Sequence, residues 1–400
     1  MPGHFTVESP GSAARALTAG AFTVGHQVES LVVQGANRYG TQDGDFPYPT
    51  SDLTATGVAA TAGSPVSLVG NELDGCGAYP APVTGDIVVV ARGTCTFGEK
   101  VFHAEQAGAV GVIVVNRDPA PIPMALDALF PTTIPAVMVG HDDGIALYGA
   151  LPTSLTITKP LYVSQLDPST AAFAPLSNLQ ADFSSQGPTD VDFRVKPDVM
   201  APGVNVLSSI PAAFCAAPPC FAFFQGTSMA TPHLAGAAAV LRGEHPTWDA
   251  WEIRSAIVNT ADYGVIQKPD NSGVQNDVNI VGSGRENLDS AVTTDVVLNP
   301  VSVSFGAVPS GAGQSKTFAV WVQNVSGSTN TFGFSIASST GLGVTYGATS
   351  SITLANGAGG WITVTMTSAK GAAAGGHQAK LVVKIGTTEV AHAAVYTLVK

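Results

Sequence analysis

The chain has 400 residues, of which 45% are hydrophobic and only 12% charged, so it is not a disordered protein and can form about two or three domains with large cores. Its formal net charge of −12 disfavours nucleic acid and anionic membrane surfaces as partners. No apolar run approaches the roughly 20 residues of a membrane helix, so no membrane span is expected. The sequence indicates no cofactor.

The four cysteines predict disulfides rather than a metal site. None forms a Cys-x-x-Cys pair, and no histidine stands at zinc-finger spacing from them. The economical pairing is Cys76–Cys95 and Cys215–Cys220; the alternative is four free thiols. Two disulfides imply an extracytoplasmic protein. Since residues 1–8 lack the basic flank and apolar core of a signal peptide, we expect a secreted protein of which this chain is a part.

Residues 46–162 have the pattern of strand, helix and strand. A buried strand over residues 85–93 precedes a helix over 101–107, and a second strand follows at 112–116, which is typical of a βαβ-like unit. The runs GDIVVVARGTCTFGEK (85–100) and AGAVGVIV (107–114) resemble a protease-associated (PA) domain. Such a domain is often inserted within a larger catalytic fold. His103 on the predicted helix is interpreted as structural or exposed.

Residues 163–292 contain the most informative segment of the chain, in which a loop leads into a helix. Gly226 permits unusual backbone angles, and Thr227 and Ser228 favour a helix start. The following residues 235–241 are apolar on every face, which predicts a buried helix. A serine in this place can be a simple capping residue. However, the octet GTSMATPH (226–233) and the small-residue helix after it resemble the nucleophile segment of the subtilisin-like serine proteases.

The resemblance implies a Ser-His-Asp triad in the chain order acid, histidine, serine, with Ser228 as the nucleophile. The backbone N–H of Ser228 would be one oxyanion donor. Four histidines precede Ser228, none of them in a His-Gly-Thr context: His4, His26, His103 and His141. The family's acid, base and oxyanion asparagine are therefore expected upstream of this chain, which we predict to be inactive alone.

Other segments also resemble subtilase core motifs. Residues 9–21 are similar to the stretch after the oxyanion asparagine, although nothing before Ser9 matches that loop. Asn37, in a Gly-Ala-Asn sequence, is interpreted as a surface-turn residue. Asp198, in KPDVMAPG (196–203), is interpreted as structural, and His233 as part of the serine motif rather than the base. Asp249 and Glu252 form a predicted capping box.

Residues 293–400 carry no catalytic signature. About seven short alternating runs separated by Gly, Ser and Asn turns predict a β-sandwich. Its position after the serine segment makes it resemble the fibronectin-type-III-like C-terminal domain of subtilases. The sequence Asn324-Val325-Ser326 could accept a glycan in a eukaryotic secretory pathway.

These features predict an α/β fold: a partial subtilisin-like parallel-sheet domain (residues 1–45 and 163–292) with an inserted α+β PA domain (46–162) and a C-terminal β-sandwich (293–400). The function expected is peptide-bond hydrolysis through an acyl-enzyme on Ser228, with proteins or peptides as substrates. One alternative is a non-catalytic PA and β-sandwich binding protein with a vestigial protease segment, and another is a hydrolase with a local base. No clustered carboxylates indicate a calcium site, and an exposed apolar surface with poor solubility is expected.

Overall fold

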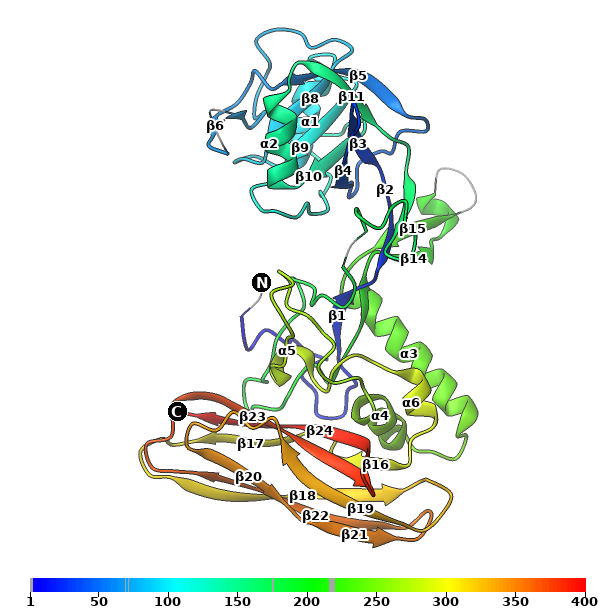
Figure 1. Ribbon diagram of the computed structural model, residues 1–400, viewed down its shortest axis with the longest axis vertical. Helices are drawn as coiled ribbons and strands as arrows, with labels where there is room; N and C mark the ends of the chain where they lie inside the picture. Colours follow the sequence, from blue (N-terminus) through cyan, green and yellow to red (C-terminus); the bar gives the residue numbers. More distant parts are fainter. Residues whose placement is uncertain (1–2, 69, 71, 175, 216–219) are drawn as a thin grey trace. The chain divides into compact units, whose positions relative to one another are not determined.

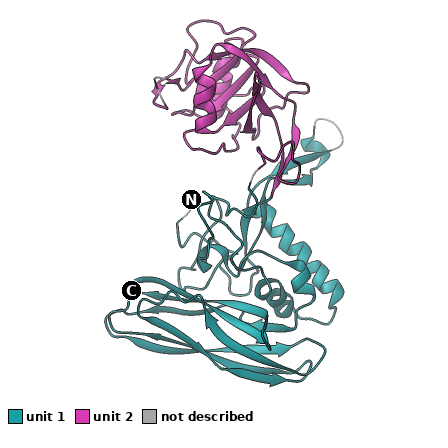
Figure 2. Cartoon of the chain, in the orientation of Figure 1, with its two compact units in different colours: residues 1–24, 176–400 teal, residues 25–175 magenta. Residues whose placement is uncertain are grey.

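The computed structural model describes residues 3–68, 70, 72–174, 176–215 and 220–400. The chain forms two compact units (Figure 2): residues 1–24 and 176–400 make up unit 1, and residues 25–175 make up unit 2. Unit 2 is thus inserted in the sequence of unit 1. Residues 25–45, grouped with the first segment in the sequence analysis, belong to unit 2 because their strands pair with its sheet.

Unit 2 is built on a closed barrel whose strands follow the order β10-β4-β3-β11-β5-β8-β9 (Figure 1). Its strands are β3 (Leu31–Gln34), β4 (Asn37–Gln42), β5 (Leu53–Ala59), β8 (Ile87–Ala91), β9 (Gly111–Val115), β10 (Ala136–Val139) and β11 (Thr153–Ile157). β8 and β9 are parallel and joined by helix α1 (Phe97–Gln106), which is the predicted βαβ connection. Every residue of β8, β9 and β10 is buried, as expected of strands that consist only of apolar residues, mostly Val and Ile.

The remaining elements of unit 2 are short. They are β2 (His26–Glu29) paired with β12 (Leu161–Ser164), β6 (Pro65–Val66) paired with β7 (Glu72–Leu73), and helix α2 (His141–Gly149). The disulfide Cys76–Cys95 joins the segment after β7 to the start of α1, as predicted from the cysteine spacing.

Two carboxyl groups are buried together near β2 and β4. Glu29 is 5% exposed and Asp43 is 4% exposed. Burial raises the pKa of Asp43 to about 7, even though the Ser30 N–H and the Thr41 hydroxyl donate to its carboxyl group. Burial, and then the charge of Asp43, raises the pKa of Glu29 well above its usual value. The folded unit therefore retains protons that the unfolded chain releases.

This retention predicts that unit 2 loses stability as the pH rises from about 4 to about 7, because the folded state binds more protons than the unfolded chain in that interval. The melting temperature of unit 2, measured by calorimetry, should be lower at pH 8 than at pH 5. Asp43→Asn should reduce this difference. Asp118→Asn, at a carboxylate whose side chain is 72% exposed, should not. Equal pH dependence in all three proteins would contradict the prediction.

The first layer of unit 1 combines a short parallel sheet with helices. β1 (Ala19–Thr23) pairs in parallel with β13 (Val199–Val204), although some 175 residues separate them in sequence. The helices are α3 (Thr227–Glu244), α4 (Ala250–Asn259), α5 (Val278–Val281) and α6 (Leu288–Val292). Asp249 and Glu252 form the predicted capping box of α4. Between β13 and α3, a ribbon of β14 (Val206–Ser209) and β15 (Phe221–Phe224) contains the predicted disulfide Cys215–Cys220.

A buried ion cluster of Lys196, Asp198 and Arg254 holds this layer together. Asp198 accepts from Lys196 Nζ at 2.8 Å, from Arg254 Nη2 at 2.7 Å and from the N–H of Thr18 at 2.8 Å. The Asp198 side chain is 0% exposed and that of Lys196 is 1% exposed. Asp198 is therefore fully engaged in linking β1, β13 and α4, as its structural interpretation predicted.

Asp198→Asn should destabilise unit 1 by about 3–5 kcal/mol, because it leaves the Lys196 ammonium buried without its counter-charge. The measurement is the free energy of unfolding in urea. Asp192→Asn is the control: Asp192 pairs with Arg194 through side chains that are 46% and 34% exposed. Asp192→Asn should lower the free energy of unfolding by at most about 1 kcal/mol. Similar losses in the two variants would refute the role assigned to the cluster.

Two sheets form the second layer of unit 1 and share one hydrophobic core. Their strand orders are β16-β18-β22-β20 and β17-β24-β23-β19-β21. The strands are β16 (Val296–Asn299), β17 (Val303–Val308), β18 (Gln314–Asn324), β19 (Asn330–Ala337), β20 (Val344–Ala348), β21 (Ser351–Leu354), β22 (Gly359–Ser368), β23 (Gly375–Ile385) and β24 (Thr388–Val399). Residues 293–400 thus form nine strands, where the sequence predicted about seven.

Asn324 is not available to a glycan, contrary to the motif-based expectation. It is 0% exposed, and its amide nitrogen donates to the carbonyls of Ser328 at 2.7 Å and Leu354 at 2.8 Å. The side chain closes the turn between β18 and β19 from within. Asn324 in this Asn-x-Ser sequence therefore has a structural role in the turn.

Candidate active site around Ser228

Ser228 lies in the first turn of α3 and is exposed. The chain reaches it from β15 through Gly226, the residue that caps the helix with φ +148° and ψ +160°. Gly226 donates its N–H to the carbonyl of Gly203 at 2.8 Å, and its own carbonyl accepts from the N–H of Met229 at 2.9 Å. The helix start is thereby fixed to the end of β13, which is partnered by β1.

A close approach of two backbone segments supports this geometry. A Cβ on Gly203 would lie 2.5 Å from that of Ala21 and 2.9 Å from the carbonyl oxygen of Gly226. Only glycine allows β13 to lie this close both to β1 and to the loop before Ser228. The position of Ser228 is therefore set by backbone contacts on both sides of the short sheet.

The N-terminus of α3 offers a site for developing negative charge. In the described part of the chain, neither the N–H nor the Oγ of Ser228 has a hydrogen-bond partner. N–H groups of a first helical turn have no acceptor within the helix, and the helix dipole adds a partial positive charge there. An exposed hydroxyl beside an unoccupied donor is the arrangement that acyl transfer requires of a nucleophile and an oxyanion site.

His233, the nearest histidine in sequence, is hydrogen-bonded within its own helix. Its Nδ1 lies 2.8 Å from the carbonyl oxygen of Met229, one helical turn earlier, so that nitrogen is occupied as a donor. Burial raises the pKa of Glu286, and the charge of His233 opposes that shift. His233 thus interacts with its own helix and with Glu286.

The other histidines considered in the sequence analysis have local partners. His4, in unit 1, contacts the carbonyl of Gly187 at 3.0 Å. His103, in unit 2, lies 3.8 Å from Glu99 on the preceding turn of α1, and His141 lies 2.8 Å from Asp142 at the start of α2. Asn37 is exposed at the beginning of β4 in unit 2. Among the described residues of unit 1, no histidine is hydrogen-bonded to Ser228.

The expectation that α3 is buried on every face is wrong for this structure. Only Ala230, Leu234, Ala237 and Leu241 are buried, and they form one stripe facing β1, β13 and α4. The opposite face, which includes Ala235, Ala239 and Val240, is exposed, with Val240 at 45%.

Comparison with known proteins decides the family. The model of the family described as Peptidase S8, Subtilase family, matches residues 2–284. The chain belongs to the subtilase family. The match includes the octet that begins at Gly226 and the segment that contains Asp198, and it extends across unit 2.

Two other subtilases are similar to this chain over different lengths of it. The minor extracellular protease Vpr of Bacillus subtilis is 30% identical over 330 residues, covering 81% of this chain and 38% of Vpr. Subtilisin-like protease SBT1.3 of Arabidopsis thaliana is 32% identical over 187 residues, covering 45% of this chain and 23% of that protein. The chain thus spans well under half the length of these relatives.

Among solved structures, the subtilisin-like protease Apa1 of Pseudoalteromonas sp. AS-11 aligns over 68% of this chain and 50% of the Apa1 chain, with 19% identity and a TM-score of 0.29.

Within the described residues, no group of three or more His, Cys, Asp or Glu side chains is arranged to hold a metal ion. No helix among them is long and apolar enough to cross a membrane.

Gly226→Ala tests the backbone geometry before Ser228. A Cβ there would meet only ordinary contacts, the nearest 3.5 Å away, but φ of +148° disfavours any side chain. We expect a loss of about 1–3 kcal/mol in the free energy of unfolding in urea.

The matched control for this variant is Gly236→Ala. Gly236 lies within α3, where an added Cβ meets nothing within 4 Å. Alanine favours the helix over glycine, so this variant should gain up to about 1 kcal/mol. Equal effects of the two substitutions would show that Gly226 has no special conformation.

Proposed function

We propose that this chain is the serine-bearing part of a subtilisin-like endopeptidase, with Ser228 as the nucleophile that forms the acyl-enzyme. The observation that carries the proposal is the octet from Gly226 to His233 at the exposed N-terminus of α3, where the N–H of Ser228 has no hydrogen-bond partner in the described part of the chain. Family membership supports the reaction class. The substrate class is protein or peptide.

In the proposed reaction, Ser228 Oγ attacks the scissile carbonyl carbon. The N–H of Ser228 then donates to the oxyanion of the tetrahedral intermediate, and the dipole of α3 stabilises the same charge. A histidine must accept the serine proton and return it to the leaving amine, and a carboxylate must orient that histidine. These groups, and the second oxyanion donor, are assigned to segments of the protein outside this chain, so the chain alone is proposed to be inactive.

Unit 2 is proposed to be a PA domain and the two-sheet layer a fibronectin-III-like domain. The sequence runs at residues 85–100 and 107–114, the parallel β8-α1-β9 connection and the insertion of unit 2 within unit 1 support the first assignment. Secretion is proposed from the two disulfides and from the similarity to the minor extracellular protease Vpr.

The second candidate function is a non-catalytic binding protein that keeps a vestigial serine segment. The observation that favours it is that no described residue of unit 1 supplies a histidine base to Ser228. The two candidates differ in one respect, namely whether Ser228 reacts when the family's acid and histidine segments are joined to this chain.

A fluorophosphonate probe distinguishes them. The 400-residue chain alone should remain unlabelled, because an isolated serine hydroxyl is a weak nucleophile. A protein that carries the family's acid and histidine segments before this chain should be labelled and should cleave casein. Ser228→Ala should abolish labelling and lower kcat by roughly a million-fold.

Two results would contradict the proposal. Labelling of the 400-residue chain that disappears in Ser228→Ala would show that it has a local base. Absence of both labelling and cleavage in the extended, folded protein would favour the binding-protein alternative.

A further inference from the structure

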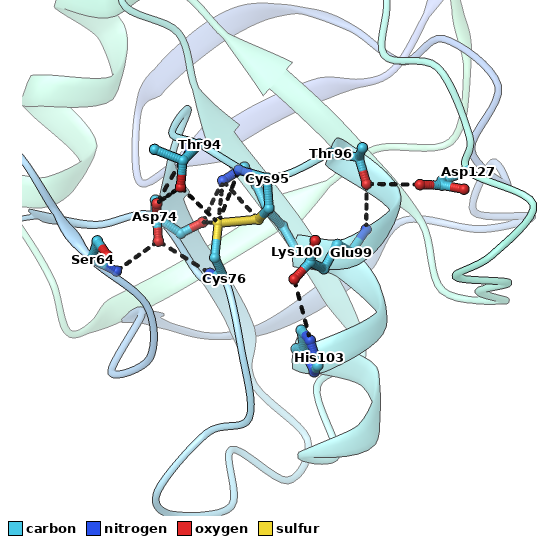
Figure 3. Close-up of polar contacts among 10 residues, drawn as sticks. All are labelled: Ser64, Asp74, Cys76, Thr94, Cys95, Thr96, Glu99, Lys100, His103 and Asp127. Atoms are coloured by element: carbon cyan, nitrogen blue, oxygen red, sulfur yellow. Dashed lines mark hydrogen bonds and ion pairs between the residues drawn. A yellow bond between two sulfur atoms is a disulfide. The ribbon is translucent and has the colours of Figure 1, made fainter.

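The disulfide Cys76–Cys95 lies against a buried ammonium group (Figure 3). Lys100, 0% exposed in α1, places its Nζ 3.3 Å from Cys76 Sγ and 3.5 Å from Cys95 Sγ. The Nζ also donates to the carbonyl of Asp74 at 2.6 Å. Among the described residues, the direct acceptors of this ammonium are thus one carbonyl oxygen and two sulfur atoms. Burial lowers the pKa of Lys100 to about 8, so the amine still carries a proton at pH 7.

Cys76 Sγ has a second donor. The N–H of Cys95, which directly precedes the N-cap Thr96 of α1, points at it from 3.2 Å. A disulfide sulfur is a weak hydrogen-bond acceptor, whereas a thiolate is a strong one. Both donors therefore interact more strongly with Cys76 after the S–S bond is broken. A neighbouring lysine and a helix N-terminus are the surroundings that favour thiolates in proteins.

We propose that Cys76–Cys95 is a reversible thiol–disulfide exchange site whose substrate is a dithiol reductant. A thiolate of the reductant attacks Cys95 Sγ and forms a mixed disulfide, while the S–S bond breaks and its electron pair passes to Cys76 Sγ. Cys76 leaves as a thiolate held by the Lys100 ammonium and the Cys95 N–H. A lower-pKa thiol is the better leaving group, which selects Cys95 as the sulfur attacked.

The second step completes the exchange. The other thiolate of the reductant attacks its own sulfur in the mixed disulfide and releases Cys95. Two electrons have then passed from the dithiol to the protein, the reductant is a cyclic disulfide, and the two thiol protons go to solvent or to the cysteines. Both cysteines are only partly buried, so a small dithiol can reach them.

The carboxylate of Asp74 makes the site reversible. It accepts from the N–H groups of Ser64 at 2.8 Å and Cys76 at 3.1 Å on one side, and from the hydroxyl of Thr94 at 3.1 Å on the other. Burial opposes ionisation, but the N–H donors, with Lys100, outweigh it and lower the pKa of Asp74. Asp74 thus joins the two cysteine-bearing segments without help from the disulfide. The sulfurs stay close after reduction and can be re-oxidised.

The test compares reduction of the 400-residue chain by dithiothreitol at pH 7 with that of Lys100→Met. Samples are quenched with iodoacetamide, and peptides containing each cysteine are quantified by mass spectrometry. Lys100→Met should slow reduction of Cys76–Cys95 roughly three- to tenfold, because the leaving thiolate loses its charged partner. Cys215–Cys220 serves as the internal reference and should be reduced at the same rate in both proteins.

Lys316→Met is the matched control. Lys316 Nζ donates to the carbonyls of Phe305 at 2.8 Å and Ala307 at 3.2 Å, in a different part of the chain. Its removal should leave the reduction of Cys76–Cys95 unchanged. Equal rates in the wild type and Lys100→Met would overturn the proposal.

Two measurements on the wild type keep the proposal testable if Lys100→Met does not fold. Glutathione should form its mixed disulfide on Cys95 rather than on Cys76. In the reduced chain, the midpoint pH for alkylation of Cys76 should lie below that of the same cysteine in urea. A mixed disulfide on Cys76, or coinciding midpoints, would refute the assignment. Re-oxidation that fails to restore the Cys76–Cys95 pairing would refute reversibility.

Discussion

The carboxylate of Asp198 joins the segments of unit 1 that are most distant in sequence. It receives hydrogen bonds from Thr18 before β1, from Lys196 before β13 and from Arg254 on α4. The main-chain carbonyl of Asp198 also accepts a hydrogen bond from the N–H of Ser283, in the turn after α5. Because these donors surround one fully buried carboxylate, the parallel pair of β1 and β13 and the helix beside it form as a unit. The placement of α3, and hence of Ser228, depends on that pair.

Ser228 is positioned by backbone packing rather than by contacts of its own side chain. Gly203 lets β13 lie against β1 and Gly226, and the unusual conformation of Gly226 turns the chain into α3. Ser228 is exposed there, and its hydroxyl and N–H have no hydrogen-bond partner among the described residues. The hydroxyl proposed as the nucleophile is therefore presented at the start of α3 by the packing of the backbone around it.

Local patterns in the sequence predicted the local features of the structure. The capping box of α4, the β8-α1-β9 connection and both disulfides depend on residues close in sequence, and all three are present. The exposed face of α3 was missed because an all-apolar run does not reveal which neighbours are present. Asn324 was misjudged because a three-residue motif carries no information on burial. The pairing of β3 with the barrel strand β11 is a long-range contact that no local pattern records.

Unit 2 accommodates buried ionisable groups in two different ways. Burial outweighs the donors around Glu29 and Asp43 and raises the pKa of both, so they retain protons to a higher pH than exposed carboxyl groups do. Lys100 retains its charge at pH 7, because a carbonyl and two polarisable sulfurs accept from its ammonium and two carboxylates lie nearby. The sequence does not distinguish these solutions, since each depends on which atoms meet in the folded barrel. A change of pH acts on the carboxyl pair and a reductant acts on the sulfurs, so unit 2 responds to two solution conditions through separate sets of residues.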